Sequence, residues 1–221
     1  MKITTALFLI FSFFICFSQS IEELELVLIE KLEKVHFEKK MSKSLDLNGD
    51  FKIILEKALQ NKDAFTFPFD SLSNFMSTKK SPDDAFRIFN WNIQFADQKQ
   101  HYECWILLKN LQIIKLNDYK SRIPEIEYVS LDAKTWFGAL YYQIIPNQRK
   151  NKIIYTLLGW DGNDMFSNKK IVESMYINKK NNVEFGFPIF SFPDGKTIQE
   201  WWKTIQGSDT RKPKLFSPIQ E

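Results

Sequence analysis

The sequence has few of the residues that common catalytic and phosphate-binding motifs require. Its 221 residues include 7 glycines, 2 histidines and 2 cysteines. The glycines are too widely spaced for a Gly-rich phosphate loop. The sequence also contains no Gly-x-Ser-x-Gly element, the motif that carries the nucleophile of α/β-hydrolases. The histidines, His36 and His101, lie far apart and predict neither a zinc cluster nor a Ser-His-Asp triad.

A strong excess of charge of one sign is also lacking. The 30 lysines and arginines nearly balance the 27 aspartates and glutamates, which leaves a net charge of +3. Nucleic-acid-binding proteins carry a larger basic excess, because they displace counterions along the phosphate backbone. We therefore expect no nucleic-acid partner. The hydrophobic fraction of 44% and the aromatic fraction of 15% are sufficient for a folded core.

The apolar run near the N-terminus, residues 6–17, is shorter than the roughly 20 residues that a membrane-spanning helix needs. It follows Lys2 and precedes Ser18 and Ser20, an arrangement typical of a secretory signal. We therefore predict a signal peptide over residues 1–20 and a mature chain that is periplasmic or extracellular, with no transmembrane helix. Cys16 lacks the small preceding residues that lipid attachment requires, so we do not expect a lipoprotein.

Without the signal peptide, Cys104 is the one remaining cysteine, which excludes an intramolecular disulfide. Its apolar neighbours predict burial in the core rather than a reactive thiol. Two polar stretches, residues 46–50 and 161–164, offer oxygen ligands for calcium, but neither matches the EF-hand loop. We expect a helix cap and a hairpin there, and predict no metal site and no cofactor.

The N-terminal segment, residues 21–80, is predicted to be helical. Apolar residues recur at intervals of three and four from residue 21 to about residue 40, as on an amphipathic helix. A polar break over residues 42–48 follows, and Asp50 is expected to cap a second helix over residues 51–59. A third, short helix is predicted to begin at Asp70.

Residues 81–195 are predicted to form an antiparallel β domain, because alternating and short apolar runs replace the helical spacing. The expected strands are 86–92, 102–109, 111–116, 126–132, 136–145, 153–160, 171–177 and 183–187. Short turns are expected at residues 146–147, 161–163, 179–182 and 193–195. The predicted fold is α+β, with the N-terminal helices packed on a curved antiparallel β-meander or a partly open barrel. Residues 196–221 are expected to be a tail with a short helix over residues 199–205.

Four strings in this region resemble a family of exported proteins of unknown function from Bacteroidetes-type bacteria. They are SPDDAFRIFNW at residues 81–91, YTLLGWDGN at 155–163, KKIV at 169–172 and FGFPIF at 185–190. The resemblance covers about residues 50–192 and carries no activity with it. Family members continue beyond the last string into further strands, whereas this chain turns to Trp201 and Trp202. The resemblance thus implies a C-terminus that is shortened or divergent.

Turn carboxylates are the candidate catalytic residues. A glycan hydrolase needs two carboxyl groups about 5–10 Å apart, and acidic residues near turns or strand ends could supply them: Asp83, Asp84, Glu103, Asp161 and Asp164. The same residues also fit ordinary turn chemistry, since Asp83 and Asp84 follow Ser81-Pro82 and Asp161 precedes a glycine.

Aromatic residues are the candidate ligand-binding residues. Tyr141 and Tyr142 are neighbours in a predicted strand, so their side chains point to opposite faces and one of them should be exposed. An exposed ring on a sheet can stack against a sugar, and the candidates for this role are Trp160, Tyr142 and Trp202. Most of the remaining aromatic rings are expected to fill the core.

The function predicted from these features is that of a non-enzymatic, exported protein that binds a ligand or associates with the cell envelope. Its partner would be a glycan or an envelope protein. The alternative is a carbohydrate-binding module or a weak glycan hydrolase that uses the exposed aromatics and the turn carboxylates.

Overall fold

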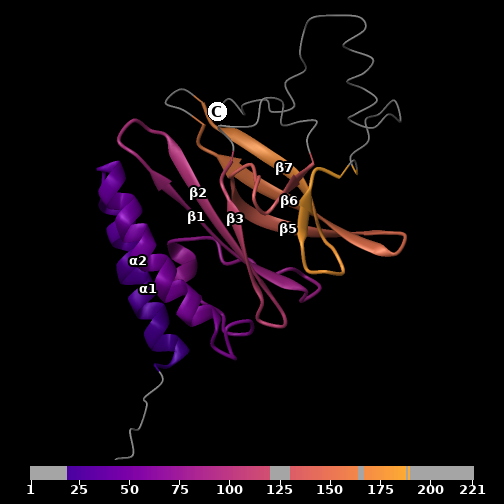
Figure 1. Ribbon diagram of the computed structural model, residues 1–221, viewed down its shortest axis with the longest axis horizontal. Coiled ribbons are helices and arrows are strands. Elements are labelled where there is room, and N and C mark those ends of the chain that lie inside the picture. Colours follow the sequence, from indigo (N-terminus) through magenta and orange to yellow (C-terminus); the bar gives the residue numbers. More distant parts are fainter. Residues whose placement is uncertain (1–18, 120–129, 164–166, 188, 190–221) are drawn as a thin grey trace, which may run out of the picture.

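The computed structural model describes residues 19–119, 130–163, 167–187 and 189 (Figure 1). The helical elements are α1 (Ile21–Phe37), α2 (Met41–Leu59) and the 3-10 turn η1 (Leu72–Asn74). The strands are β1 (Phe86–Gln94), β2 (Gln100–Leu108), β3 (Ile113–Asn117), β4 (Leu131–Asp132), β5 (Leu140–Arg149), β6 (Lys152–Asp161), β7 (Lys169–Ile177) and β8 (Val183–Phe185). The predicted strand over residues 126–132, of which β4 is the end, lies partly outside the described residues.

The strands form two open antiparallel sheets. The order is β1-β2-β3 in the three-stranded sheet and β4-β8-β7-β6-β5 in the five-stranded sheet. Each hydrogen-bonded pair of strands is antiparallel. With two helices ahead of them, these sheets give an α+β fold with a partly open sheet, which confirms the predicted fold class.

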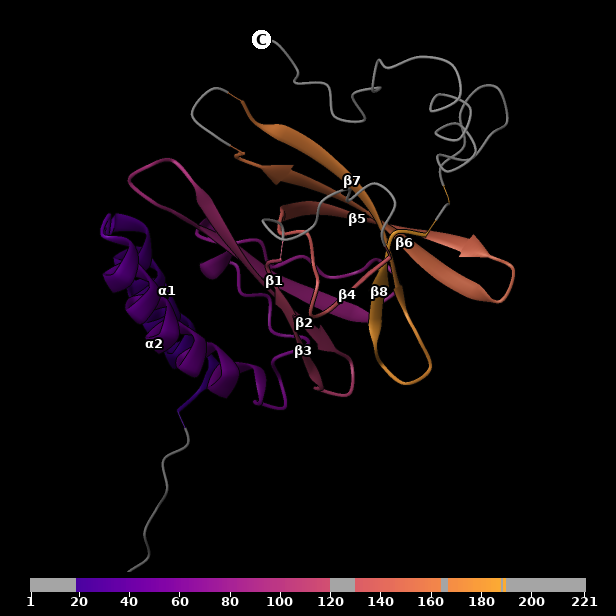
Figure 2. The ribbon, with the colours of Figure 1, turned by 45° about the horizontal axis from the view of Figure 1, so that its top comes forward.

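The elements stack in three layers, with the helices on one side, the three-stranded sheet in the middle and the five-stranded sheet on the other side (Figures 1 and 2). Strands β1 and β2 of the middle sheet are therefore largely buried on both faces. In β2, Trp105 and Leu107 face the core beneath the helices, whereas Cys104 and Ile106 face the core between the sheets. This arrangement explains why β2 reads as a continuous apolar run, and it confirms the predicted burial of Cys104.

The two sheets are joined along one edge by the side chain of Asn90 on β1. Its amide group donates to the carbonyl oxygens of Glu103 and Ala139, at 2.8 and 3.0 Å. Its oxygen accepts a hydrogen bond of 2.6 Å from the backbone N–H of Tyr141. Near the opposite edge, the backbone N–H of Tyr119 donates to the carbonyl of Trp136 at 2.8 Å. The sheets thus approach a barrel without closing into one.

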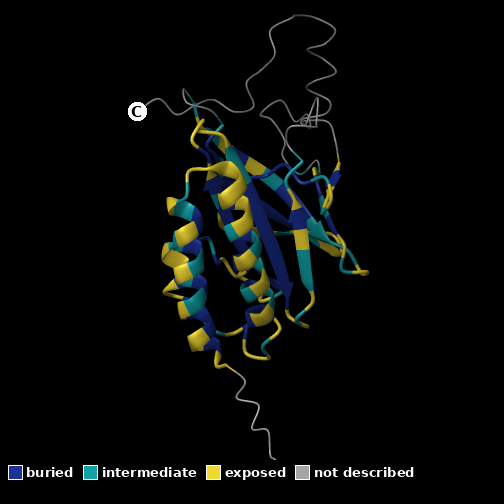
Figure 3. Ribbon diagram, turned by 60° about the vertical axis from the view of Figure 1, so that its left-hand side comes forward, coloured by how far each residue is buried: buried dark blue, intermediate teal, exposed yellow. Residues whose placement is uncertain are grey.

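Helix α1 has the amphipathic pattern that the sequence predicts. Ser20 and Glu23 form a capping box that satisfies backbone N–H groups at the start of the helix. The predicted apolar stripe is buried throughout: Ile21, Leu24, Leu28, Leu32 and Val35. Figure 3 shows that the helices turn their exposed faces outward, away from the sheet.

Helix α2 is longer than predicted, because the expected polar break over residues 42–48 is helical. Asp50 therefore lies inside the helix and does not cap it; the N-cap is Lys40. The buried residues of α2 recur at helical spacing along one face: Ser44, Asn48, Phe51, Leu55, Ala58 and Leu59.

The predicted break is wrong. The helix continues through these residues because tertiary contacts provide hydrogen-bond partners for the polar side chains on the buried face of α2. The Ser44 hydroxyl donates to the carbonyl of Val35 at 3.3 Å. Asn48 accepts a hydrogen bond from the indole N–H of Trp91 at 2.9 Å and donates to Glu103 at 2.8 Å. These bonds remove the cost of burying hydroxyl and amide groups, and a hydropathy pattern does not reveal them.

Residues 60–85 are mostly irregular and are held against β1 by Arg87. The predicted helix at Asp70 is reduced to the single turn η1. The buried guanidinium group of Arg87 donates to the carbonyl oxygens of Phe67, Pro68 and Thr78. Burial lowers the pKa of Arg87 to about 10, against the opposing effect of nearby acidic groups.

Two of the predicted turns differ in the structure. Residues 146–147 lie inside β5, where Pro146 is tolerated because β5 is the edge strand of its sheet. The real turn between β5 and β6 is at Lys150 and Asn151. Asp161 pairs with Lys169 across the β6–β7 ladder, so the connection between them is longer than a tight hairpin turn. The predicted turn at 193–195 and helix at 199–205 lie outside the described residues.

Candidate functional site

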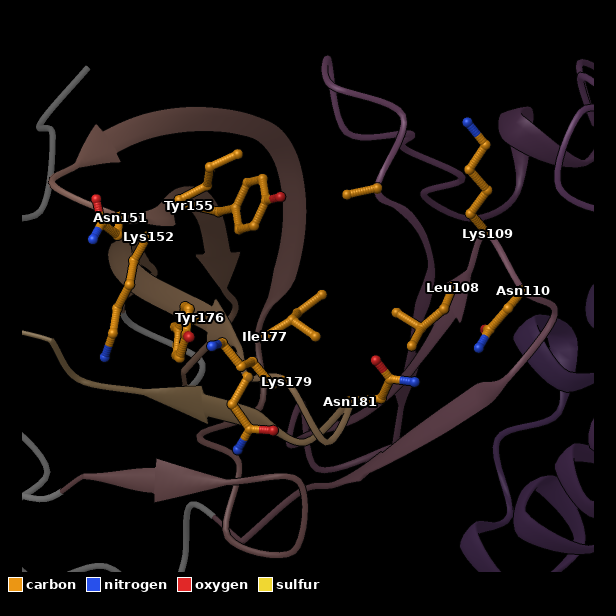
Figure 4. Close-up of a pocket in the computed structure, with 13 residues that line it drawn as sticks. Leu108, Lys109, Asn110, Asn151, Lys152, Tyr155, Tyr176, Ile177, Lys179 and Asn181 are labelled. Carbon is orange, nitrogen blue, oxygen red and sulfur yellow. The ribbon is translucent and has the colours of Figure 1, made fainter.

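A groove of about 480 Å³ lies where turns of the two sheets meet (Figure 4). One wall comes from the end of β2 and the turn that follows it, and the other comes from the β5–β6 and β7–β8 hairpins. The lining residues are Ala85, Leu108, Lys109, Asn110, Asn151, Lys152, Ile153, Tyr155, Tyr176, Ile177, Asn178, Lys179 and Asn181.

Asparagine side chains stabilise the turns that carry the groove. Asn110 caps its own turn, because its side-chain oxygen accepts a hydrogen bond of 3.1 Å from the backbone N–H of Gln112. In the β7–β8 hairpin, the side-chain oxygen of Asn178 accepts from the backbone N–H groups of Lys180 and Asn182, at 2.9 and 3.1 Å. Such bonds are typical of asparagine in turns.

Contacts between the sheets brace the groove near its two ends. The Asn181 amide donates to the side-chain oxygen of Gln112 at 2.8 Å, which links the β7–β8 and β2–β3 turns. The ring of Tyr155 packs edge-on against Phe86 with 4.8 Å between ring centroids. The Tyr155 hydroxyl donates to a carboxylate oxygen of Asp83 at 2.7 Å. The two walls are therefore connected before any ligand enters.

Apolar groups and lysines form the rest of the groove. In Figure 4, Tyr155 and Ile177 lie across the opening from Leu108. The Lys152 amine lies 4.8 Å from the centre of the Tyr176 ring, a cation–π contact. Lys109 and Lys179 add positive charge, and no aspartate or glutamate is among the lining residues that the structure describes. The groove can therefore hold a ligand that combines an apolar or ring-shaped group with a negatively charged group.

The turn carboxylates predicted from the sequence are spread over the molecule. Asp83 lies beside the groove and is bonded to Tyr155, the pKa of which is raised by burial and by this hydrogen bond. Asp84 is exposed and pairs with Lys80 at 2.8 Å. Asp161 is buried and accepts a hydrogen bond of 3.2 Å from the Tyr102 hydroxyl.

The structure does not bring Asp83 and Asp161 together. Tyr155, which holds Asp83, and Asp161 are six residues apart on β6, or about 20 Å along an extended strand. Glycosidases place their two carboxyl groups about 5–10 Å apart. Asp164 lies outside the described residues.

Two of the three aromatic candidates, Tyr142 and Trp160, lie on the outer face of the five-stranded sheet and outside the groove lining. Tyr141 is fully buried and Tyr142 is 44% exposed, which confirms that one of the two neighbours is accessible. The amine of Lys170 lies 5.5 Å from the centre of the Tyr142 ring. Trp160 is partly buried and is paired with Lys170 in the β6–β7 ladder. Trp202 lies outside the described residues.

Sequence reasoning missed a partly buried acid between the sheets. Glu173 accepts a hydrogen bond from the Tyr141 hydroxyl, and that hydroxyl accepts one of 2.7 Å from the indole N–H of Trp136. Burial raises the pKa of Glu173 to about 7, although the bond from Tyr141 opposes this shift. The signal was present in β7, where Glu173 occupies the inward position between the buried residues Ile171 and Met175.

A second polar cluster, built around the candidate acid Glu103, ties α2 to the three-stranded sheet. Glu103 accepts hydrogen bonds from Lys52 at 2.7 Å and from Asn48 at 2.8 Å. His101 lies 3.4 Å from Glu103 and 3.8 Å from Asp118. Burial acts to raise the pKa of Glu103, but His101 and Lys52 outweigh it and hold that pKa below its ordinary value. These groups satisfy one another and stabilise the packing of the helix.

Comparisons of the chain with protein-family models, with curated proteins and with solved structures find no match. Neither of the two described helices combines the length and the apolar character needed to cross a membrane. Among the described residues, no three histidine, cysteine, aspartate or glutamate side chains are grouped to hold a metal ion. The contacts and chemistry of the groove are therefore the basis for the function.

Proposed function

We propose that this chain is an exported, non-enzymatic binding protein that holds a small ligand in the groove between its two sheets. The groove is the main observation in support of this proposal, because its volume of about 480 Å³ lies within the range of about 300–1,000 Å³ typical of small-molecule sites. The N-terminal apolar run supports placement in the periplasm or outside the cell.

The chemistry of the walls supports binding. Leu108 and Ile177 offer apolar surface, and burial of such surface is the main favourable term in ligand association. Amide groups and lysines around them can orient a polar ligand. The bond between Asn181 and Gln112 links the two walls in advance, which lowers the entropic cost of ordering the site around a ligand.

The proposal can be tested by a thermal melt with a panel of calcium, neutral and acidic oligosaccharides, and peptidoglycan fragments. A ligand at about 100 times its dissociation constant should add about 2.7 kcal/mol to the free energy of unfolding. The variant Asn110→Trp places a large ring on the exposed turn at the groove wall. We expect this variant to fold and to lose the ligand-induced shift.

The matched control is Asn74→Trp, on the exposed side of η1 and outside the groove lining. It should keep the full shift. A shift of equal size in both variants would place the ligand elsewhere, and a panel that gives no shift with the unchanged protein would contradict the binding function.

A second candidate function is sugar binding on the outer face of the five-stranded sheet. The exposure of Tyr142 favours it, together with that of Val172 on the same sheet, 44% and 50% respectively. Stacking of a sugar on the Tyr142 ring would require Lys170 to move aside. If this face is the site, Tyr142→Ala should abolish oligosaccharide binding, Asn110→Trp should leave it intact, and Val172→Ala should weaken it only slightly.

A further inference from the structure

We infer that the groove selects an acidic sugar: a saccharide that carries a carboxylate, sulfate or phosphate group. This inference rests on the proposed binding function and specifies the chemical class of its ligand. Two features of the groove support it, namely its unbalanced positive charge and the pairing of aromatic or apolar surface with amide groups.

The charge of the groove differs from that of the whole chain. The sequence is nearly balanced, with 30 basic and 27 acidic residues, whereas the described residues that line the groove include three lysines and no carboxylate. Elsewhere on the surface, lysines such as Lys43 and Lys80 form ion pairs of 2.9 and 2.8 Å. Within the described residues, Lys152 and Lys179 have no such partner, so their charge is available to a ligand.

The carboxylates near the groove lie outside its described lining, and each has a partner within the protein. The Asp83 carboxylate accepts a hydrogen bond of 2.7 Å from the Tyr155 hydroxyl. Asp84 forms its ion pair with Lys80 on the exterior. Lys109 is not the ion-pair partner of Asp84 and is the smallest of the causes that act on the Asp84 pKa. Glu184 accepts a hydrogen bond of 2.7 Å from the Asn178 amide. Among the described lining residues the charged groups are lysines, and apolar walls focus their field toward the opening, so an anion is favoured there over a cation.

The remaining groups suit a sugar ring better than a simple inorganic anion. The ring of Tyr176 lies beside the Lys152 amine, so a negative group near this lysine would bring its attached ring close to an aromatic surface. Asn110 uses its oxygen within the turn, which leaves its amide N–H groups for hydroxyl acceptors. Leu108 and Ile177 offer apolar contact for the C–H faces of a sugar.

Two pairs of probes test the inference by isothermal titration calorimetry. Trigalacturonate is compared with its neutral counterpart galactotriose, and glucose 6-phosphate with glucose. At low salt we expect at least one acidic probe to bind about 10-fold more tightly than its neutral partner, as one or two charge-assisted contacts would produce. The preference should disappear near 1 M NaCl, because salt at this concentration screens the attraction between charges over a distance of about 3 Å.

Variants separate a local effect from a general effect of charge. The double variant Lys152→Gln/Lys179→Gln should reduce the affinity for the acidic probe to that for the neutral one. The control, Lys62→Gln/Lys134→Gln, changes the net charge equally at exposed lysines outside the groove lining. It should leave the preference unchanged.

The outcomes distinguish the inference from the proposed function. Equal affinity for the acidic and neutral probes would overturn the inference and leave the binding function standing. An equal loss in both double variants would also overturn it, because the preference would then reflect net charge alone. If none of the four probes binds at millimolar concentration, the inference is wrong, and the panel melt with Asn110→Trp decides the binding function separately.

Discussion

At the scale of single residues, Glu173 is the group with the clearest consequence for stability. Its pKa is about 7 in the folded protein, against an ordinary value of 4.5, and burial is the main cause. Between these two values the folded state holds a proton that the unfolded state has lost. The free energy of unfolding should therefore decrease as the pH rises from about 4.5 to about 7.

We expect this decrease to amount to about 2 kcal/mol. This is less than the full pKa shift would give, because Glu173 keeps some solvent exposure. Glu173→Gln keeps an acceptor for Tyr141 but cannot ionise, so its free energy of unfolding should change less over this pH range. Urea unfolding at several pH values measures the difference. Glu22→Gln, at an exposed position on α1, should retain the original dependence, and an unchanged dependence in Glu173→Gln would contradict the assignment.

Arg87 is the second residue with a strong expected effect. Its guanidinium group reaches three backbone carbonyls of the irregular segment before β1. Lysine cannot reproduce that planar set of donors, so Arg87→Lys should lower the free energy of unfolding by about 2–4 kcal/mol. In urea unfolding, the matched change Arg149→Lys at an exposed position should have an effect below about 0.5 kcal/mol. Similar losses in both variants would show that Arg87 does not anchor this segment.

At the scale of elements, the sequence predicted best where one face of an element is apolar and the other polar. The stripe of α1 is an example, and all five of its predicted apolar positions are buried. Prediction failed for the first half of α2, because Asn48 is polar and yet buried against Trp91 and Glu103. It also failed at Pro146, because the sequence does not reveal which strand lies at a sheet edge.

Two neighbouring positions test the continuous α2 helix. Asn48→Ala should cost about 2–3 kcal/mol, because the Trp91 indole N–H and the Glu103 carboxylate each lose a buried partner. Gly49→Ala should instead stabilise the protein by about 1 kcal/mol, since the added methyl group meets no atom within 4 Å and alanine favours a helix. Thermal melts compare the two variants. A destabilising Gly49→Ala would support the loop that the sequence predicted.

At the scale of the whole molecule, the groove depends on contacts between segments that lie far apart in the sequence. Gln112 and Asn181, which link its two walls, are 69 residues apart. The turn signals at residues 179–182 were readable locally, but the order of strands that brings them beside the β2–β3 turn was not. Individual turns were therefore predictable, whereas the site they form required the tertiary structure.

The central claim is that a ligand binds between the two sheets, and hydrogen exchange with and without a stabilising ligand from the panel tests it most directly. We predict slower backbone exchange in the turns that form the groove, around Asn110, Asn151 and Asn181, with no change around Tyr142 on the outer face. Protection confined to the strands around Tyr142, with no change in these three turns, would contradict the account.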